Sequence, residues 1–122
     1  MHAAQPGSQR EVFHREILIS FWKVHILHHA AENPVVGQWM LEELRRHGYT
    51  VSSGTLYPVL KRMETRGWLR SRADPAGGAR ARREYHLTSR GRRVLAAVSR
   101  FLTELTGEVN APARRSRRIA GR

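Results

Sequence analysis

The chain has 122 residues, carries 22 basic and 10 acidic side chains for a formal net charge of +12, and contains no cysteine. This length fits one domain, and the lack of cysteine excludes disulfides, thiolate zinc sites and cysteine nucleophiles. The sequence has no 18-residue apolar run and no signal-peptide pattern, so it predicts a soluble cytoplasmic protein without a membrane partner.

The N-terminal part is predicted to contain an arm and one long helix. Residues 1–9 are small and polar and predict a flexible arm. Residues 10–33 predict a helix that ends at Asn33-Pro34, because proline disfavours helical geometry in the residue before it. Apolar residues cover more than one stripe of this helix, which indicates burial on two sides, by its own domain and by a partner.

The middle of the chain, residues 34–88, is predicted to hold two short helices and a β-hairpin. One helix spans residues 38–47 and ends at Gly48. The next is capped by Ser52 or Ser53 and runs to about residue 66, where Gly67 stops it. Residues 68–72 and 83–88 alternate apolar and polar side chains on either side of turn-forming residues 74–78, a pattern typical of two paired strands.

The C-terminal part is predicted to be a helix followed by a tail. Residues 89–108 have apolar side chains at three- and four-residue steps, begin after a cap at Thr88 or Ser89, and end at Gly107. Residues 109–122 contain five arginines and almost nothing to bury, which predicts a basic disordered tail.

Together these elements predict a mainly α fold with a small β-hairpin. It is a winged helix-turn-helix domain flanked by N- and C-terminal dimerisation helices. The residues predicted to form the dimer contact are apolar side chains of the two flanking helices: Ile17, Phe21, Trp22, Val98, Phe101, Leu102 and Leu105.

Positive charge is concentrated in one part of the chain. Residues 1–60 have five basic and five acidic side chains, whereas residues 61–93 have eleven basic and three acidic ones, a net charge of +8. A neutral half joined to a basic half indicates that a polyanion docks on one face. A helix followed by a basic hairpin is what a winged helix-turn-helix uses to hold a DNA groove and its phosphates, so double-stranded DNA is the predicted partner.

The DNA-binding residues are expected on the third helix and on the hairpin. The start of the helix places small polar side chains beside unpaired backbone amides, which suits a phosphate, and Tyr57, Lys61 and Arg62 follow on its outer side. The hairpin arginines follow a Gly-Gly turn and can reach phosphates or a minor groove. Strand alternation separates Arg83 from the other two, which leaves an ion pair within the hairpin as its alternative role. The predicted set is Ser52, Ser53, Thr55, Tyr57, Lys61, Arg62, Arg80, Arg82 and Arg83.

The chain resembles the PadR-type transcriptional regulators, and within them the short branch that has a single C-terminal helix. The resemblance covers about residues 15 to 105. It is carried by Pro34-x-x-Gly37, Gly48, Ser52-x-Gly54-Thr55-Leu56-Tyr57-Pro58-x-Leu60-x-Arg62-Met63-Glu64-x-x-Gly67 and Arg80-x-Arg82-Arg83-x-Tyr85-x-Leu87-Thr88-x-x-Gly91. It implies a winged-helix dimer, built from the first and last helices, that usually represses nearby genes and releases DNA on binding a small molecule.

Two positions and the aromatic content of the last helix depart from the pattern of this family. Gln38 follows Gly37 where the family commonly has tyrosine, and Ala79 precedes the hairpin arginine where it commonly has glycine. Some relatives bind flat aromatic compounds between tryptophans of the last helix. Here that helix has only Phe101, so the sequence does not support that mode of binding.

Histidines on the first helix suggest a metal site. His25, His28, His29 and Glu32 are spaced by three or four residues, which places imidazoles and a carboxylate on adjoining helix faces, as zinc or a similar divalent metal requires. His14 or a second copy of the helix is a source of further ligands. No cofactor is required by this interpretation, and zinc or cadmium is the candidate effector. The alternative is that these histidines lie on the surface or pack at the dimer contact.

The sequence therefore predicts a sequence-specific DNA-binding transcriptional regulator, a ligand- or metal-responsive repressor that binds a palindromic operator as a homodimer. The alternatives are a non-specific nucleic-acid-binding architectural protein and a module whose basic face binds an acidic protein. An enzyme is not expected, because there is no phosphate-binding glycine loop and no local Ser-His-acid arrangement, and the one aspartate lies in a turn.

Overall fold

The computed structural model describes residues 9–73, 76 and 82–112, with side chains from residue 15 onward. The described residues form four helices and a three-stranded antiparallel sheet, which confirms the predicted mainly α class. In chain order the elements are α1 (Gln9–Glu32), β1 (Val35–Val36), α2 (Gly37–Arg46), α3 (Ser53–Thr65), β2 (Leu69–Ala73), β3 (Arg83–Leu87) and α4 (Ser89–Asn110). The predicted arm at residues 1–8, the tip of the hairpin and residues 113–122 of the predicted tail lie outside the described residues.

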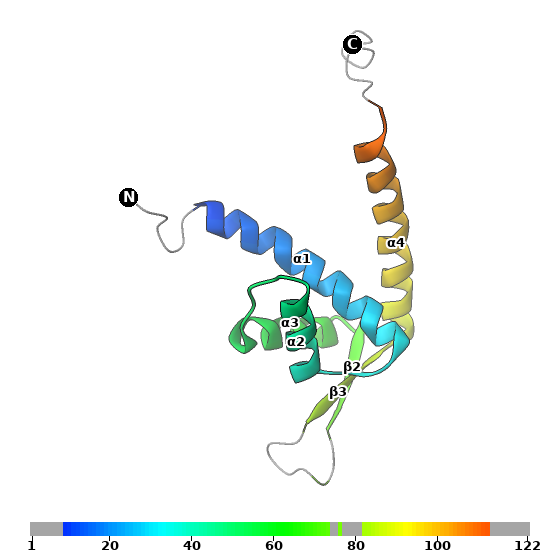
Figure 1. Ribbon diagram of the computed structural model, residues 1–122. Coiled ribbons are helices and arrows are strands. Elements are labelled where there is room, and N and C mark those ends of the chain that lie inside the picture. The colour runs from blue at the N-terminus through cyan, green and yellow to red at the C-terminus, as the bar shows by residue number, and fades with distance from the viewer. Residues whose placement is uncertain (1–8, 74–75, 77–81, 113–122) are drawn as a thin grey trace, which may run out of the picture.

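Two long helices frame the molecule. Figure 1 shows that α4 starts beside the C-terminal end of α1 and that the two helices then diverge, so that they form the arms of a V. The shorter helices α2 and α3 pack below α1, and the β2–β3 hairpin projects away from the V. Leu18 and Ile19 of α1 still pack against the core, whereas the C-terminal half of α4 is exposed in the described part of the protomer.

The sheet has the strand order β1-β3-β2. In the hairpin, Ser71 lies opposite Tyr85 and Leu69 lies opposite Leu87. β1 pairs with the other edge of β3, where Val35 lies opposite Tyr85. β1 is not predicted by the sequence, because a two-residue strand has no alternation to detect and exists only through its pairing with β3.

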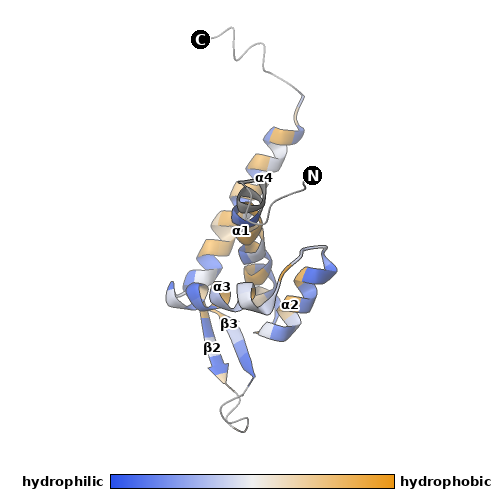
Figure 2. Cartoon of the chain, turned by 90° about the vertical axis from the view of Figure 1, so that its left-hand side faces the viewer, coloured by the Kyte–Doolittle hydropathy of each residue, from blue (hydrophilic) through white to orange (hydrophobic). Residues whose placement is uncertain are grey.

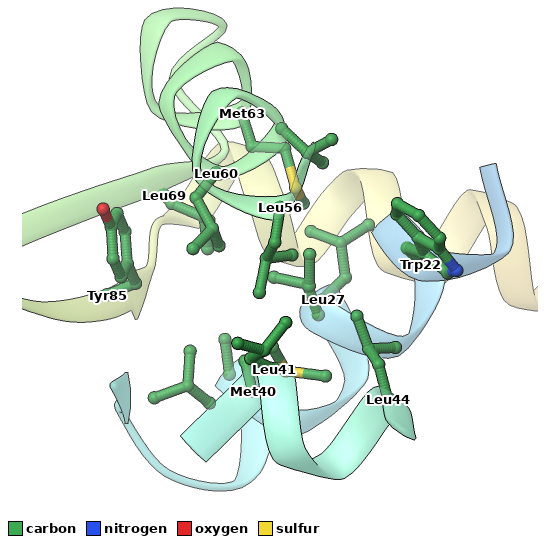
Figure 3. Packing of buried hydrophobic residues seen from close by; sticks show 14 of the residues in the cluster. Trp22, Leu27, Met40, Leu41, Leu44, Leu56, Leu60, Met63, Leu69 and Tyr85 are labelled. Carbon is green, nitrogen blue, oxygen red and sulfur yellow. The ribbon is translucent and has the colours of Figure 1, made fainter. Parts of the chain in front are cut away.

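The core is formed where α1, α2 and α3 meet the sheet. Figure 3 shows Leu56, Leu60 and Met63 of α3 pointing toward Leu27 of α1 and Met40 of α2, and all five side chains are fully buried or nearly so. Tyr85 and Leu69 close the core on the sheet side. Because α3 commits one face to this core, its opposite face is left to solvent.

Glycines end the two short helices as predicted. Gly48 follows α2 with φ of 96° and Gly67 follows α3 with φ of 82°, both in the left-handed region that favours glycine. The prediction that Gly107 ends the last helix is wrong, since α4 continues to Asn110. A single glycine costs a helix only about 1 kcal/mol, so it does not stop a helix by itself. Among the described residues, no helix has the length and apolar character needed to cross a bilayer.

Candidate nucleic-acid interface

The exposed side of α3 forms a ridge that we call the α3 ridge, made of Tyr57, Lys61 and Arg62. All three side chains are exposed. Lys61 lies at the centre of the ridge, opposite the buried Leu56 and Met63. Helical spacing turns Tyr57 toward the hairpin and Arg62 toward α1. The ridge thus presents a phenol and two cations over about one and a half turns of the helix.

The phenol of Tyr57 is positioned by the start of α2. Its ring lies so close to Gly37 that a Cβ atom at residue 37 would be 2.5 Å from Tyr57 Cε1. Gly37 is buried, and the same corner is lined by Arg82 and Tyr85. Glycine at position 37 is therefore what allows the tyrosine to rest against α2 while it remains partly exposed.

The start of α3 differs in one respect from the expectation. Ser52 occupies the N-cap position, but its side chain makes no cap hydrogen bond to the backbone. Its hydroxyl instead lies 3.1 Å from the hydroxyl of Thr55. The serine cap is therefore wrong as a side-chain interaction, and Ser52, Ser53 and Thr55 place polar side chains around the positive end of the helix dipole, where an anion is favoured.

Positive charge also gathers between α3 and α1. Partial burial lowers the pKa of Lys23 on α1, and the nearby guanidinium groups of Arg62 and Arg66 lower it further. Three cations that repel one another in this way raise the local potential. A polyanion that neutralises them gains electrostatic free energy, and that gain falls with added salt.

The hairpin is fixed to α3 by a chain of hydrogen bonds. The backbone N–H and the hydroxyl of Ser71 both donate to Glu64 Oε2, at 3.1 and 2.7 Å. Arg83 Nη1 in turn donates to Ser71 Oγ at 3.0 Å. These bonds from Ser71 are the main reason why the pKa of Glu64 is lowered. Arg83 therefore holds a contact within its own hairpin while it remains exposed; Arg82 is also exposed, and Arg80 lies outside the described residues.

The predicted dimer residues are mostly exposed apolar side chains of the two arms. Ile17 is 58 % exposed and Phe101 is 64 % exposed, and Phe21, Leu102 and Leu105 are also exposed, whereas Val98 is half-buried. Figure 2 shows the apolar residues recurring along α4 to its far end. Val109 joins this apolar surface, and it was missed because the helix was expected to end earlier.

Trp22 does not belong to that surface. Its side chain is 3 % exposed and packs in the core of the protomer, edge-on against the ring of Tyr49 with ring centroids 6.4 Å apart. The assignment of Trp22 to the dimer contact is therefore wrong. The sequence indicated a helix with two apolar sides but did not show which side faces the core.

The predicted histidine cluster is divided into two overlapping groups. One contains His28, His29 and Glu32, and the other contains His25, His29 and His47, each with its possible ligand atoms within 4.8 Å of one another. His47, at the end of α2, was not among the predicted residues. His14 lies outside the residues whose side chains the structure describes.

A buried carboxylate adjoins the second group. Glu43 of α2 is 8 % exposed and accepts hydrogen bonds from Arg46, at 3.1 Å to Oε1 and 2.8 Å to Oε2. Its Oε2 also lies 3.1 Å from His47 Nε2 and 3.5 Å from His29 Nε2. The bond from Arg46 is the main reason why the pKa of Glu43 is lowered. The four-residue spacing of Glu43 and His47 was the available signal, but only the packing of α2 against α1 brings them to His29.

Comparison with known proteins agrees with this geometry. Residues 26–97 match the model of the transcriptional regulator PadR-like family. Transcriptional regulator Rv3488 of Mycobacterium tuberculosis is 50 % identical over 95 residues, which cover 78 % of this chain and 88 % of that protein. A PadR-like transcription factor from Bacteroides fragilis has a similar fold, with a TM-score of 0.72, 23 % identity, and coverage of 83 % of this chain and 98 % of that one. A PadR-like transcriptional regulator from Bacillus cereus has a TM-score of 0.68 at 25 % identity, covering 78 % and 93 % of the two chains.

Proposed function

This chain belongs to the PadR-like family of transcriptional regulators, and we propose that it acts as a homodimeric repressor that binds a palindromic operator and responds to an effector. Membership of this family makes it a DNA-binding regulator of transcription and not an enzyme. The proposal concerns how it binds DNA, in what assembly and under what control.

The observation that supports the proposal is that one protomer exposes both a basic surface, the α3 ridge, and an apolar surface on the arms of the V. The α3 ridge offers an exposed Lys61 beside Arg62, and the arms of the V expose apolar side chains such as Phe21 and Leu105. Contiguous apolar side chains on paired helices are typical of a protein–protein contact. Docking the arms of two copies buries these side chains and presents two α3 ridges with two-fold symmetry.

Such a dimer matches an operator with the same symmetry. Each α3 ridge enters a major groove, and the two grooves lie about one helical turn apart, at roughly 34 Å. Arg82, exposed near the tip of the hairpin just before β3, then reaches the phosphates that flank each groove. A dimer bound over a promoter in this way represses transcription by occupying it.

The effector is proposed to act between α1 and α2. These helices border an open cavity of about 900 Å³ whose lining includes His29, Trp39, Glu43 and Arg46. Arg46, which lines the cavity, is the last residue of α2 and directly precedes the link to α3. A ligand that changes how α2 packs on α1 therefore changes the placement of the α3 ridge.

The experiment compares Lys61→Ala with Arg100→Ala in the full chain. Both variants remove one positive charge, but the exposed Arg100 lies on α4, far from the α3 ridge. Gel-shift titration at physiological salt uses the DNA that precedes the protein's own gene and a scrambled fragment of equal length. Sedimentation at matched protein concentration reports the assembly state.

We expect a dimer in all three proteins and a preference of wild type for the promoter fragment of at least about 1,000-fold. Lys61→Ala is expected to weaken that binding by at least about tenfold, and Arg100→Ala by less than about threefold. Equal affinity of wild type for both fragments would favour a non-specific architectural protein. A stable monomer would refute the proposed assembly.

A further inference from the structure

The second histidine group consists of His25 and His29 on α1 and His47 directly after α2, so it links these two helices. We propose that His25, His29 and His47 form a site for a divalent metal ion of the zinc class, with the Glu43 carboxylate completing or supporting it. The site ties the C-terminal end of α2 to α1. It assigns a chemical class to the effector, and this regulatory part of the inference rests on the proposed function.

The donor atoms lie at separations that suit one ion. Zinc bound tetrahedrally at about 2.0–2.1 Å from each nitrogen keeps its ligand atoms about 3.4 Å apart. Glu43 Oε2 already lies 3.1 Å from His47 Nε2 and 3.5 Å from His29 Nε2. The possible ligand atoms of the three histidines all lie within 4.8 Å of one another, and the rings of His25 and His47 have centroids 4.8 Å apart. Small side-chain rotations therefore bring all three nitrogens to a common point.

The chemistry of the donor set also suits zinc. Three imidazoles and a carboxylate are typical zinc ligands, and the chain has no thiolate to compete for the metal. Zinc binds the deprotonated nitrogen of an imidazole, so affinity at a site of this kind falls as the pH is lowered.

The competing group is a poorer site. His28, His29 and Glu32 all come from the last two turns of α1, and the side chains of His28 and Glu32 are 57 % and 59 % exposed. Their separations are those of loose surface pairs, 3.7 Å between His28 Nε2 and Glu32 Oε2 and 3.8 Å between His29 Nδ1 and Glu32 Oε1. The group with His47 instead draws its ligands from two elements, so that binding the ion joins them.

Joining α1 to α2 has a consequence for the α3 ridge. Arg45 Nε of α2 donates to the carbonyl of Val51 at 3.0 Å, directly before the start of α3, and the hydroxyl of Tyr49 lies 3.4 Å from His25 Nε2. The metal site thus includes the first residue of the link between α2 and α3, His47, and contacts Tyr49 within the link, while Arg45 holds the far end of the link to α2. An ion that draws His47 toward α1 shifts this link and, in a dimer, the spacing of the two α3 ridges.

The test measures binding of Zn²⁺ and Cd²⁺ to the untagged full chain by competition with a chromophoric chelator at pH 7.5. The variants are His47→Ala, the milder His47→Gln, and Glu43→Gln, with His28→Ala as the matched control from the competing group. Circular dichroism at each step verifies that the variants are folded. The same proteins are then titrated with promoter DNA with and without Zn²⁺.

We expect one ion per chain, a loss of affinity of at least about 100-fold for both His47 variants, about tenfold for Glu43→Gln, and less than about threefold for His28→Ala. A loss of metal affinity in His28→Ala, with unchanged metal affinity in both His47 variants, would overturn the assignment in favour of the competing group. Equal affinity in all proteins, or no binding by the wild type, would show that there is no such site.

The DNA titration separates the two parts of the inference. If Zn²⁺ changes promoter affinity of the wild type but not of His47→Gln, the site is the effector site. If metal affinity depends on His47 but Zn²⁺ does not change promoter affinity, the site binds metal but is not the effector site. If no protein prefers the promoter fragment, the proposed function fails, although the metal site stands.

Discussion

The junction of α4 with the sheet rests on Gly91, and substitution of this residue gives the sharpest test of the fold. A Cβ atom at position 91 would lie 2.6 Å from Leu87 Cδ1, 3.1 Å from the carbonyl carbon of Trp68 and closer still to its oxygen. That oxygen accepts a hydrogen bond from Thr88 N at 3.1 Å, so it is held in place. We therefore expect Gly91→Ala to destabilise the protein.

The magnitude follows from three contributions. Overpacking costs about 1–3 kcal/mol, and loss of the bond between Thr88 and Trp68 costs about 1 kcal/mol. Replacing glycine by alanine within a helix returns about 0.5–1 kcal/mol. The net expectation is a decrease of about 2 kcal/mol in the free energy of unfolding.

Gly107 in the same helix supplies the matched control. A Cβ atom at position 107 meets nothing within 4 Å, and helical spacing places it on the side of α4 opposite Leu105. Gly107→Ala should therefore stabilise the protein by about 0.5 kcal/mol, through helix propensity alone. The two glycines are about 24 Å apart along the helix, so the double variant should show additive effects.

The assay is urea denaturation followed by circular dichroism at one fixed protein concentration, because the proposed dimerisation would make apparent stability concentration-dependent. The urea concentration at the midpoint of unfolding is expected to be highest for Gly107→Ala, intermediate for wild type and lowest for Gly91→Ala. A Gly91→Ala protein as stable as wild type would refute the reasoning, since it would mean that α4 does not pack against the Trp68 carbonyl as described.

Two further predictions concern α3. Gly37→Ala should push the ring of Tyr57 out of its place and weaken promoter binding about tenfold, with little loss of stability because the ring is free to move toward solvent. Glu64→Gln should lower the free energy of unfolding by about 1 kcal/mol at pH 7, because Ser71 then donates to a neutral group. The pKa of Glu64 is lowered below 4.5 in the folded state, so its contribution is present above pH 4.5 and disappears as the pH falls through the folded-state value.

Each of these predictions has a result that would contradict it. For Gly37→Ala, the control is the same substitution in a Tyr57→Ala background, where no ring remains to be displaced. A similar additional loss of affinity in that background would show that the effect does not pass through Tyr57. For Glu64→Gln, denaturation curves from pH 3 to pH 7 should converge with those of wild type at low pH. A difference that stays constant over this range would exclude the carboxylate charge as its cause.

The elements that the sequence predicted well are those that carry their own local signals. Gly48 and Gly67 end helices because of their backbone conformation, which depends on the residue itself and little on its neighbours. The hairpin strands alternate because one side packs on the core and the other does not, as Tyr85 and Glu84 show. Both kinds of signal can be read within a window of a few residues.

The features that were missed depend on contacts between distant segments. Trp22 and Phe21 are adjacent and both apolar, and only the position of α2 and α3 determines that the first is buried and the second exposed. Apart from its four-residue spacing to His47, Glu43 resembled a surface glutamate such as Glu42 in the sequence, yet it is buried beside His47 and close to His29. Binding residues of this kind become visible only when the packing of α1 on α2 is known.

The shared use of α1 explains why dimer geometry and DNA binding are expected to be coupled. Ile26 and Leu27 are fully buried against the DNA-binding unit, so this part of α1 moves with α3 as one body. Phe21, about one and a half turns earlier on the same helix, belongs to the exposed apolar arm that is proposed to meet the partner. A rotation of α1 at the proposed dimer contact would therefore be transmitted to the α3 ridge without any change in the core. The histidine group lies at a point where a bound ion could change how α1 packs against α2. His25 and His29 are on α1, whereas His47 is the first residue of the link that leads to α3. An effector bound there needs to shift only the few contacts between α1 and α2 to change the distance between two ridges that must fit one duplex.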